Sequence, residues 1–279
     1  MCKKILLALL LIFIFAFSAF CDEKDILYVG FLNRLMTNEE EFYKIVKNSW
    51  STKGWSVLGG NHDVDAAIFY DSLISMQMAL NSGEIDEMIL PDFVAEYLMK
   101  VNQDYRPSCI SNSGTMGLCF GFMNDKKELA ERWNNALRMI RNEWILSGLV
   151  QSYIKDSQDN NFYGKNKNRI KFERFQNAET VKVAVTGDMP PIDYVAADGM
   201  PAGFNIALLS EIGKRLKVNI EIVTLSANAR TSALVSGRAD VVFWYEINTS
   251  LGRQFDVPDE VILSEPYYEW NQFFHMRNQ

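Results

Sequence analysis

The sequence has little of the chemistry on which metal centres and many enzymes depend. Only two of its 279 residues are histidines and four are cysteines, which disfavours both a Cys–His metal site and a histidine general base. We find no Ser-His-Asp order, no G-x-S-x-G or H-E-x-x-H motif and no phosphate-binding loop. The sequence therefore predicts neither a metal nor a cofactor, and it disfavours an enzyme.

Positive charge is also in the minority. The chain has 28 Lys and Arg against 35 Asp and Glu, which gives a formal net charge of −7. No basic patch with interleaved aromatic residues stands out, so nucleic acid is not an expected partner.

Long hydrophobic runs are missing after the N-terminus. Residues 1–21 (MCKKILLALLLIFIFAFSAFC) have the charged start and apolar centre of a secretory signal peptide, and the apolar centre is short for a membrane span. Either Cys21 becomes lipidated, although the bulky Phe20 precedes it, or the leader is simply cleaved, for example after Ser18. An uncleaved anchor helix is a third reading. We expect export to the periplasm or the outer face of the cytoplasmic membrane, with membrane contact only through a lipid anchor.

Two cysteines remain in the body of the chain, Cys109 and Cys119. In an oxidising compartment they could form a disulfide across a hairpin around Asn112-Ser113-Gly114. The alternative is a pair of buried free thiols.

The C-terminal part of the chain reads as a parallel α/β unit. Val181, Val183 and Val185 alternate with other residues and predict a half-buried strand. An amphipathic helix is expected over 204–216. The expected elements after it are a strand over 219–225, a short helix over 228–236 ended by Gly237, and a buried strand over 239–244.

A second α/β lobe is expected over residues 24–116. Its predicted elements are a strand within 26–36, a helix over 37–50, a strand over 66–69, a helix over 73–82, a strand over 85–90 and a helix over 93–101. The sequence ALNSGEIDEM at 79–88 is echoed by ALVSGRADVV at 233–242, which favours two similarly built lobes. Between the lobes we predict a hinge strand over 116–123, helices over 125–142 and 144–155, and a linker over 157–168.

These segments resemble a known family. The sequences GDMPPIDYVAADGMPAGFNIALLSEIGKRL, ALVSGRADVVF and LSEPYY are similar to the first lobe of the bacterial extracellular solute-binding proteins of family 3. The sequence GLCFGFMNDKKELAERWNNALRMIRNEWILSGLVQSYI resembles the last segment of that family. The resemblance implies a two-lobed α/β fold of the type II periplasmic binding proteins, with hinge strands and a cleft between the lobes.

The order of the segments differs from the family. Here a second-type lobe (22–116) follows the signal peptide, and a first-type lobe (117–279) comes last. The first-type lobe contains the closing helices (125–155), the linker and the P-P-I-D-Y unit (180–270). We interpret this as a circularly permuted binding protein, which is feasible because domain termini often lie close together. The competing interpretation is a pair of half-modules from two tandem proteins.

Ligand-binding residues are expected at the strand ends of both lobes. Arg230, at a helix start, could hold a carboxylate by paired hydrogen bonds, and Tyr194 could stack on a ligand. Each residue also has a structural alternative: Asp193 could stabilise a turn, Trp244 and Tyr245 could be core residues, and the arginines could be surface charges. The candidates are Asp193, Tyr194, Asn228, Arg230, Trp244, Tyr245, Thr249 and Arg253 in one lobe, and Asn33, Arg34, Asp71 and Asp92 in the other.

The family's amino-acid-binding members use an Arg for the α-carboxylate and an Asp for the α-ammonium group. Thr249 matches the Thr of the family's Thr-x-x-Arg motif, but Gly252 stands at the Arg position and Arg253 comes one residue later. Pro91 stands at the Asp position, and Asp92 is next to it. These shifts weaken an amino-acid assignment and favour the broader class of small polar solutes.

The resemblance implies an extracytoplasmic protein, without enzymatic activity, that captures a small polar solute for the permease of an ABC importer. Amino acids and small carboxylates are the candidate solutes, and we expect a monomer. Two alternatives stay open. One is a periplasmic sensory or structural lipoprotein without a role in import. The other is a small-acid lyase or dehydratase that would use Asp193 or Glu246 as its acid or base.

Overall fold

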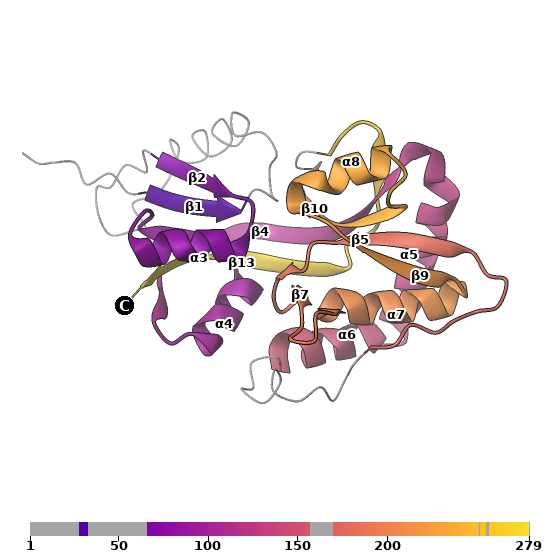
Figure 1. Cartoon of the computed structure of the whole chain (residues 1–279), viewed down its shortest axis with the longest axis horizontal. Coiled ribbons are helices and arrows are strands. Elements are labelled where there is room, and N and C mark those ends of the chain that lie inside the picture. Colours follow the sequence, from indigo (N-terminus) through magenta and orange to yellow (C-terminus); the bar gives the residue numbers. More distant parts are fainter. Residues whose placement is uncertain (1–27, 33–65, 157–169, 251, 255–256, 279) are drawn as a thin grey trace, which may run out of the picture.

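The chain folds into two α/β lobes of unequal size joined by two long strands (Figure 1). The sheet has the strand order β2-β1-β3-β13-β4-β10-β5-β9 and so continues from one lobe into the other. This arrangement confirms the two-lobed α/β fold predicted from the sequence. The computed structural model describes residues 28–32, 66–156, 170–250, 252–254 and 257–278.

The described part of the small lobe contains three parallel strands and two helices. Strand β1 pairs with both β2 and β3 in parallel. Helix α3 begins after Ser72, whose hydroxyl accepts a hydrogen bond from the backbone of Ser75, and it ends at Gly83, which has φ 77°. The elements are β1 (Tyr28–Leu32), β2 (Ala66–Tyr70), α3 (Leu73–Ser82), β3 (Glu87–Pro91) and α4 (Asp92–Val101).

The large lobe is the parallel unit expected in the C-terminal part of the chain. Strand β5 pairs in parallel with β9 and β10, which confirms the predicted strand–helix–strand order. Helix α5 turns one apolar face, including Trp133 and Leu137, into the core. The main elements are α5 (Lys127–Asn142), β5 (Thr180–Val185), α7 (Phe204–Leu216), β9 (Asn219–Thr224), α8 (Arg230–Val235) and β10 (Val241–Asn248). The shorter ones are η2 (Asn124–Lys126), α6 (Ile145–Val150), the π-helical turn η3 (Gln151–Lys155), η5 (Ala227–Ala229), β6 (Asp188–Met189), β7 (Asp193–Val195), β8 (Pro201–Ala202), β11 (Arg253–Gln254) and β12 (Val261–Leu263).

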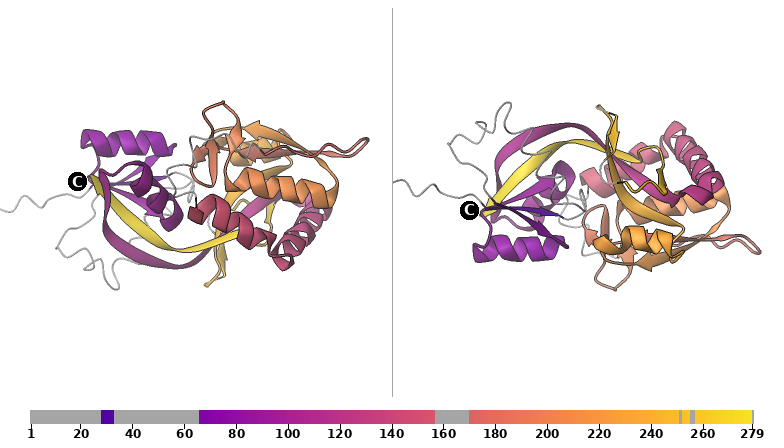
Figure 2. Two further views of the ribbon diagram at one scale, coloured as in Figure 1. Left: turned by 90° about the horizontal axis from the view of Figure 1, so that it is seen from below. Right: turned by 90° about the horizontal axis from the view of Figure 1, so that it is seen from above.

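Two antiparallel strands, β4 (Tyr105–Met123) and β13 (Tyr268–Asn278), run side by side from one lobe to the other (Figure 2). Their register shifts between Trp270 and Gln272. Beyond this bulge, β13 pairs with β3 of the small lobe. The last strand of the predicted lobe over 117–279 therefore pairs both with β4 and with β3 of the small lobe.

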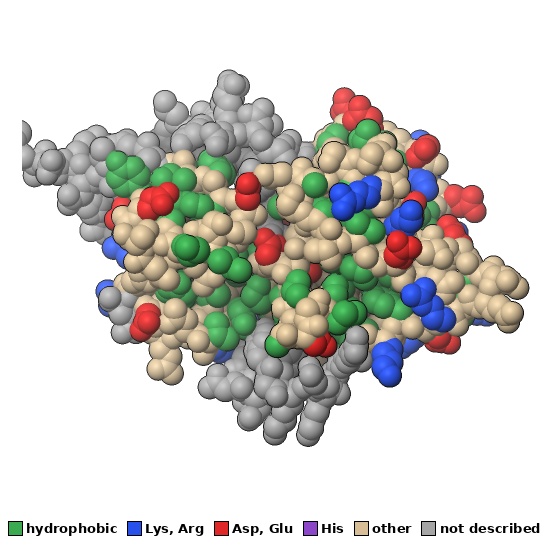
Figure 3. Space-filling view, viewed as in Figure 1, with side chains coloured by type: hydrophobic (Ala, Val, Ile, Leu, Met, Phe, Trp, Pro, Cys, Tyr) green, Lys and Arg blue, Asp and Glu red, His purple; other side chains and the backbone are tan. Residues whose placement is uncertain are grey.

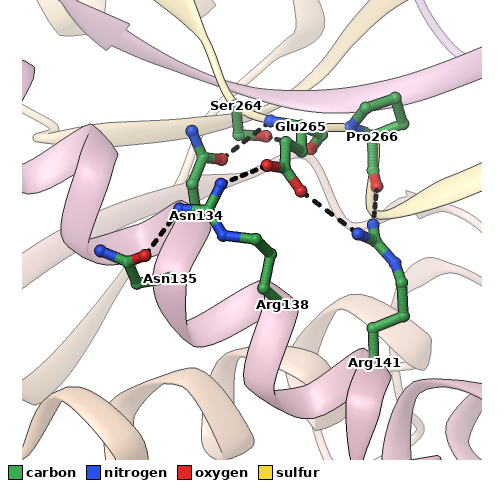
Figure 4. Close-up of polar contacts among 7 residues, drawn as sticks. All are labelled: Asn134, Asn135, Arg138, Arg141, Ser264, Glu265 and Pro266. Atoms are coloured by element: carbon green, nitrogen blue, oxygen red, sulfur yellow. Dashed lines mark hydrogen bonds and ion pairs between the residues drawn. The ribbon is translucent and has the colours of Figure 1, made fainter.

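The start of β13 is fastened to helix α5 (Figure 4). The Glu265 carboxylate accepts hydrogen bonds from Arg138 at 2.5 Å and Arg141 at 3.2 Å. The Glu265 backbone N–H donates to the amide oxygen of Asn134 at 2.8 Å, and Arg141 also donates to the carbonyl of Pro266 at 2.9 Å. These contacts hold the beginning of the crossing strand on the large lobe.

The other end of β13 is held by a buried charged group. The Glu87 carboxylate accepts from Arg277 at 2.5 Å and from Ser108 at 2.7 Å, and it lies 3.2 Å from Nδ1 of His275. Glu87 and His275 are both buried. Burial by itself raises the pKa of Glu87, but the hydrogen bonds from His275 and Ser108 and the charge of Arg277 outweigh it and lower the pKa.

The hairpin expected around Asn112-Ser113-Gly114 is wrong, because these residues lie inside the continuous strand β4. Along that strand Cys109 pairs with His275 and Cys119 with Tyr245. The two thiols are free, with Cys119 buried and Cys109 partly buried, so of the two alternatives the structure has free thiols and not a disulfide. Burial, followed by the charges of Glu246 and Glu269, raises the pKa of Cys119 to about 12.

Some predictions fall on other parts of the chain. The signal peptide with Cys21, the helix over 37–50 and the linker over 157–168 lie outside the described residues. None of the helices in the described ranges is long and apolar enough to cross a membrane.

Candidate functional site

Two predicted ligand residues from different lobes meet at the boundary between them. Asp71 follows strand β2 of the small lobe, and Asn228 lies in η5 of the large lobe. The Asn228 side-chain amide donates a hydrogen bond to the Asp71 carboxylate at 2.6 Å, although the residues are 157 positions apart. The sequence placed Asp71 after a strand and Asn228 at the start of a short helix, but it gave no sign that they bond to each other.

A group of four aromatic rings occupies the boundary, and we call it the interlobe aromatic cluster: Phe93, Trp244, Tyr268 and Trp270. Phe93, in the first turn of α4, lies 6.2 Å from Trp244, 5.3 Å from Tyr268 and 6.2 Å from Trp270 between ring centroids. All four side chains are buried. Since Phe93 belongs to the small lobe and Trp244 to the large one, their contact crosses the boundary.

Of this cluster, only Trp244 was predicted from the sequence. Phe93, Tyr268 and Trp270 were missed. Phe93 could have been found, since it follows a buried strand and the predicted Asp92. Tyr268 and Trp270 could not be found in this way, because their place at the boundary depends on β13 crossing between the lobes.

Trp244 has an unusual backbone conformation. Its φ is 72°, in the left-handed region where a non-glycine residue costs about 1–3 kcal/mol. The register between β10 and β4 shifts between Val242 and Tyr245, so Trp244 lies in a bulge of its strand. The bulge turns a large ring toward the lobe boundary at the end of a parallel strand.

Arg230 supports this bulge from inside the large lobe. Its guanidinium donates to the backbone carbonyls of Ala227 at 3.0 Å, Phe243 at 3.4 Å and Trp244. It also lies over the ring of Tyr245, 5.6 Å from the centroid. Arg230 is only 6% exposed, so it is not the surface charge considered as an alternative. Its contacts with the backbone differ from the carboxylate grip that the sequence suggested.

Asp193 has the structural contacts of a turn residue. Its carboxylate accepts from the backbone N–H of Thr186 at 2.9 Å and of Gly187 at 3.1 Å, and from the Thr186 hydroxyl at 3.3 Å. Asp193 is fully buried. Its neighbour Tyr194 pairs with Asp188 in the short β6–β7 hairpin. Asp193 therefore stabilises a turn, which was the structural alternative to ligand binding.

Asp92 begins helix α4 at the boundary. Its carboxylate accepts from the backbone N–H of Phe93 at 2.6 Å, and it also bonds to the backbone of Asn271, in the bulge of β13. Burial raises the pKa of Asp92 despite these hydrogen bonds and the charge of Lys155. Lys155 of the large lobe lies 3.9 Å from Glu96 of α4, which makes a second polar contact between the lobes.

The other predicted residues lie elsewhere. The Thr249 hydroxyl donates to the carbonyl of Thr115 at 3.0 Å and so ties the end of β10 to β4. The Tyr245 hydroxyl is 3.0 Å from that of Thr231, within the large lobe. Arg253 is in β11, and its side chain is outside the described set, as are Asn33 and Arg34.

The charge along the boundary is mainly negative on the face shown in Figure 3. Acidic side chains lie between the lobes, whereas most of the Lys and Arg side chains lie on the outer part of the large lobe. Within the described ranges, no three His, Cys, Asp or Glu side chains are arranged to hold a metal ion. The described side chains at the boundary are therefore mainly carboxylates, an amide and aromatic rings.

Two α/β lobes, two crossing strands and polar side chains from both lobes at the boundary are the features that the two-lobed fold expected from the sequence would have. Residues 181–279 match the model of the bacterial extracellular solute-binding proteins, family 3, which is 99 of the 279 residues. The match confirms the resemblance for this part of the chain, which includes the P-P-I-D-Y loop, Trp244 and β13. No curated protein sequence matches the chain.

Several solved structures are similar at low identity. The zinc-bound ligand-binding component of an ABC-type import system from Staphylococcus aureus is 12% identical with a TM-score of 0.42, over 91% of this chain and 66% of that one. AgaA from A. tumefaciens R10, in complex with agropinic acid, is 11% identical with a TM-score of 0.41, over 76% and 55%. CbnR, a LysR family transcriptional regulator, is 9% identical with a TM-score of 0.42, over 95% and 67%. This chain thus spans 55–67% of the length of these proteins, and similarity at this level carries no conclusion about what it binds.

Proposed function

We propose that this protein binds a small solute at the boundary between its lobes and presents it to the permease of an ABC importer. The observation that carries the proposal is the hydrogen bond between Asp71 and Asn228, two predicted ligand residues on opposite lobes. A solute that enters between the lobes must separate this pair, and closure brings the pair together again. The family match over residues 181–279 supports the same function.

The class of solute follows from the side chains at the boundary. Arg230, the residue expected to grip a carboxylate, donates to backbone carbonyls, while Asp71 and Asp92 bring negative charge to the boundary. We therefore favour a polar solute that donates hydrogen bonds over a simple carboxylate, and an amino acid fits only if another group holds its carboxylate. Export by the N-terminal leader and a monomeric state belong to the same proposal.

A thermal-shift screen of the purified protein tests this function. The screen would cover amino acids, amines, small carboxylates and oligopeptides. A solute that binds only the folded protein, at 100 times its dissociation constant, stabilises it by about 2.7 kcal/mol. A flat screen across all these classes would count against a solute-binding role.

Variants at the boundary then locate the site. We expect Asp71→Ala and Asn228→Ala each to weaken binding of the solute by roughly 5- to 30-fold, equivalent to the 1–2 kcal/mol of a lost hydrogen bond. Asp104→Ala is the matched control, because Asp104 is an exposed aspartate of the small lobe next to the far end of β4. If the control weakens binding as much as the boundary variants do, the solute binds elsewhere.

A further inference from the structure

We propose that the solute carries a planar ring, which inserts between Phe93 and Trp244 when the lobes open and close. This inference rests on the proposed solute-binding function and specifies the class of solute. It follows from the placement of the two rings on different lobes, the backbone that holds Trp244, and the apolar surroundings of both.

The first step is the contact itself. The Phe93 and Trp244 rings are 6.2 Å apart between centroids, with their planes 38° from parallel. One ring moves with the small lobe and the other with the large lobe, so opening separates two aromatic faces. A flat ring can then lie between them at about 3.5–4.0 Å from each, the normal contact distance of carbon atoms. Closure of the lobes would clamp it from both sides.

The second step is the strained backbone conformation of Trp244. A tryptophan at φ 72° is held against its own backbone preference, and residues in this region cluster at ligand clamps. Arg230 maintains the conformation through the carbonyls of Phe243 and Trp244. A glycine would adopt the bulge without strain, so the large ring at this position serves a contact that a glycine could not make.

The third step concerns the surroundings of the ring. Phe93 is 1% and Trp244 is 2% exposed, and Tyr268 and Trp270 pack on Phe93 in edge-to-face contacts. Such a cluster offers apolar faces, whereas the carboxylate of Asp92 lies at its margin, bonded to the backbone of Phe93. A ring in the centre with a polar group at its edge matches this distribution.

Pairs of probes with equal charge test the ring apart from its substituent. Suitable pairs are phenethylamine with hexylamine, benzoate with hexanoate, and phenylalanine with leucine. In whichever charge class binds, we expect the ring-bearing member to bind roughly 2- to 12-fold more tightly, the range given by one aromatic contact. Equal or tighter binding of the aliphatic member overturns the ring inference and leaves the solute-binding function intact. If neither these probes nor the broader screen gives binding, the proposed function fails as well.

Variants show whether these two rings are the ones that bind. We expect Phe93→Leu and Trp244→Leu to abolish the preference for the ring-bearing probe, and Phe93→Tyr to retain it. The matched control is Phe122→Leu, since Phe122 is also fully buried but packs on Trp133 in the large lobe. Circular dichroism identifies any variant that does not fold, and Phe93→Tyr then decides the question. Retention of the ring preference in Phe93→Leu or Trp244→Leu, or its loss in Phe122→Leu, would contradict the assignment.

Discussion

Replacing Arg230 by methionine should destabilise the protein strongly, whatever it does to solute binding. The guanidinium donates hydrogen bonds to three backbone carbonyls, those of Ala227, Phe243 and Trp244, and it is nearly inaccessible to water. A hydrogen bond to a charged group contributes about 1.5–3 kcal/mol, and a buried carbonyl without a partner is costly. Because two of the acceptors are neighbours, the losses overlap, and we expect a decrease of about 3–5 kcal/mol in the free energy of unfolding.

Urea denaturation followed by circular dichroism measures this decrease. Arg230→Lys should recover only part of the loss, because a single ammonium group cannot reproduce the fork of the guanidinium. Arg238→Met is the matched control, since Arg238 is exposed in the same segment. The reasoning is refuted if the free energy of unfolding of Arg230→Met lies within about 1 kcal/mol of that of the control while the variant no longer binds solute. That result would place the guanidinium on the solute.

Three further changes have defined expectations. In Gly121→Ala the new Cβ would lie 2.3 Å from the Tyr245 ring, so urea denaturation should show a loss of about 1–3 kcal/mol. Gly148→Ala, in open space, should lose nothing. Glu87 has a lowered pKa, so the stability it contributes is present above its unfolded pKa and is lost as the pH falls through the lower folded value. In thermal unfolding experiments from pH 7 to pH 3, Glu87→Gln should lose less stability with falling pH than the unchanged protein does. Glu265→Ala should cost less than about 1 kcal/mol by the same denaturation assay, because its ion pairs are exposed and screened.

Regular helices and buried strands could be predicted well from this sequence. Helix α7 has the predicted bounds, because its apolar residues repeat at helical spacing and the helix ends in a left-handed residue, Lys217. The parallel unit around it follows from the alternating valines of β5 and the apolar run of β10. These signals are local, so they do not depend on the other lobe.

The long crossing strand could not be predicted in the same way. Asn112-Ser113-Gly114 is a turn signal in sequence, yet pairing with β13 extends this segment into strand β4. The partner strand is more than 150 positions away, and local propensity is overridden by a full row of hydrogen bonds. The expected hairpin was also the basis of the disulfide alternative, and without a hairpin Cys109 and Cys119 lie at different levels of one strand.

The candidate site was predicted in part for a related reason. Strand ends identified Asp71, Asp92 and Trp244, because ligands bind where parallel strands end, and Asn228 was expected at the start of the short helix over 228–236. Its residue type and its place at a helix start suggested that Arg230 would bind a carboxylate. The backbone bulge at Trp244, which decides where the guanidinium points, depends on the pairing of β10 with β4. The sequence could predict which polar and aromatic residues lie near the strand ends, but it could not predict the direction in which each side chain points.

The paired strands β4 and β13 also determine how the motion between the lobes could be followed. A two-stranded ribbon resists sliding of one strand along the other, because sliding would break the hydrogen bonds between them, but it bends more easily out of its plane. The bulge at Asn271 and the left-handed Gly114, with φ 72°, lie where the ribbon passes between the lobes. Relative movement of the lobes should therefore be close to rotation about one axis. A single distance, from one fluorophore on each lobe, would then be enough to describe how far the molecule is open.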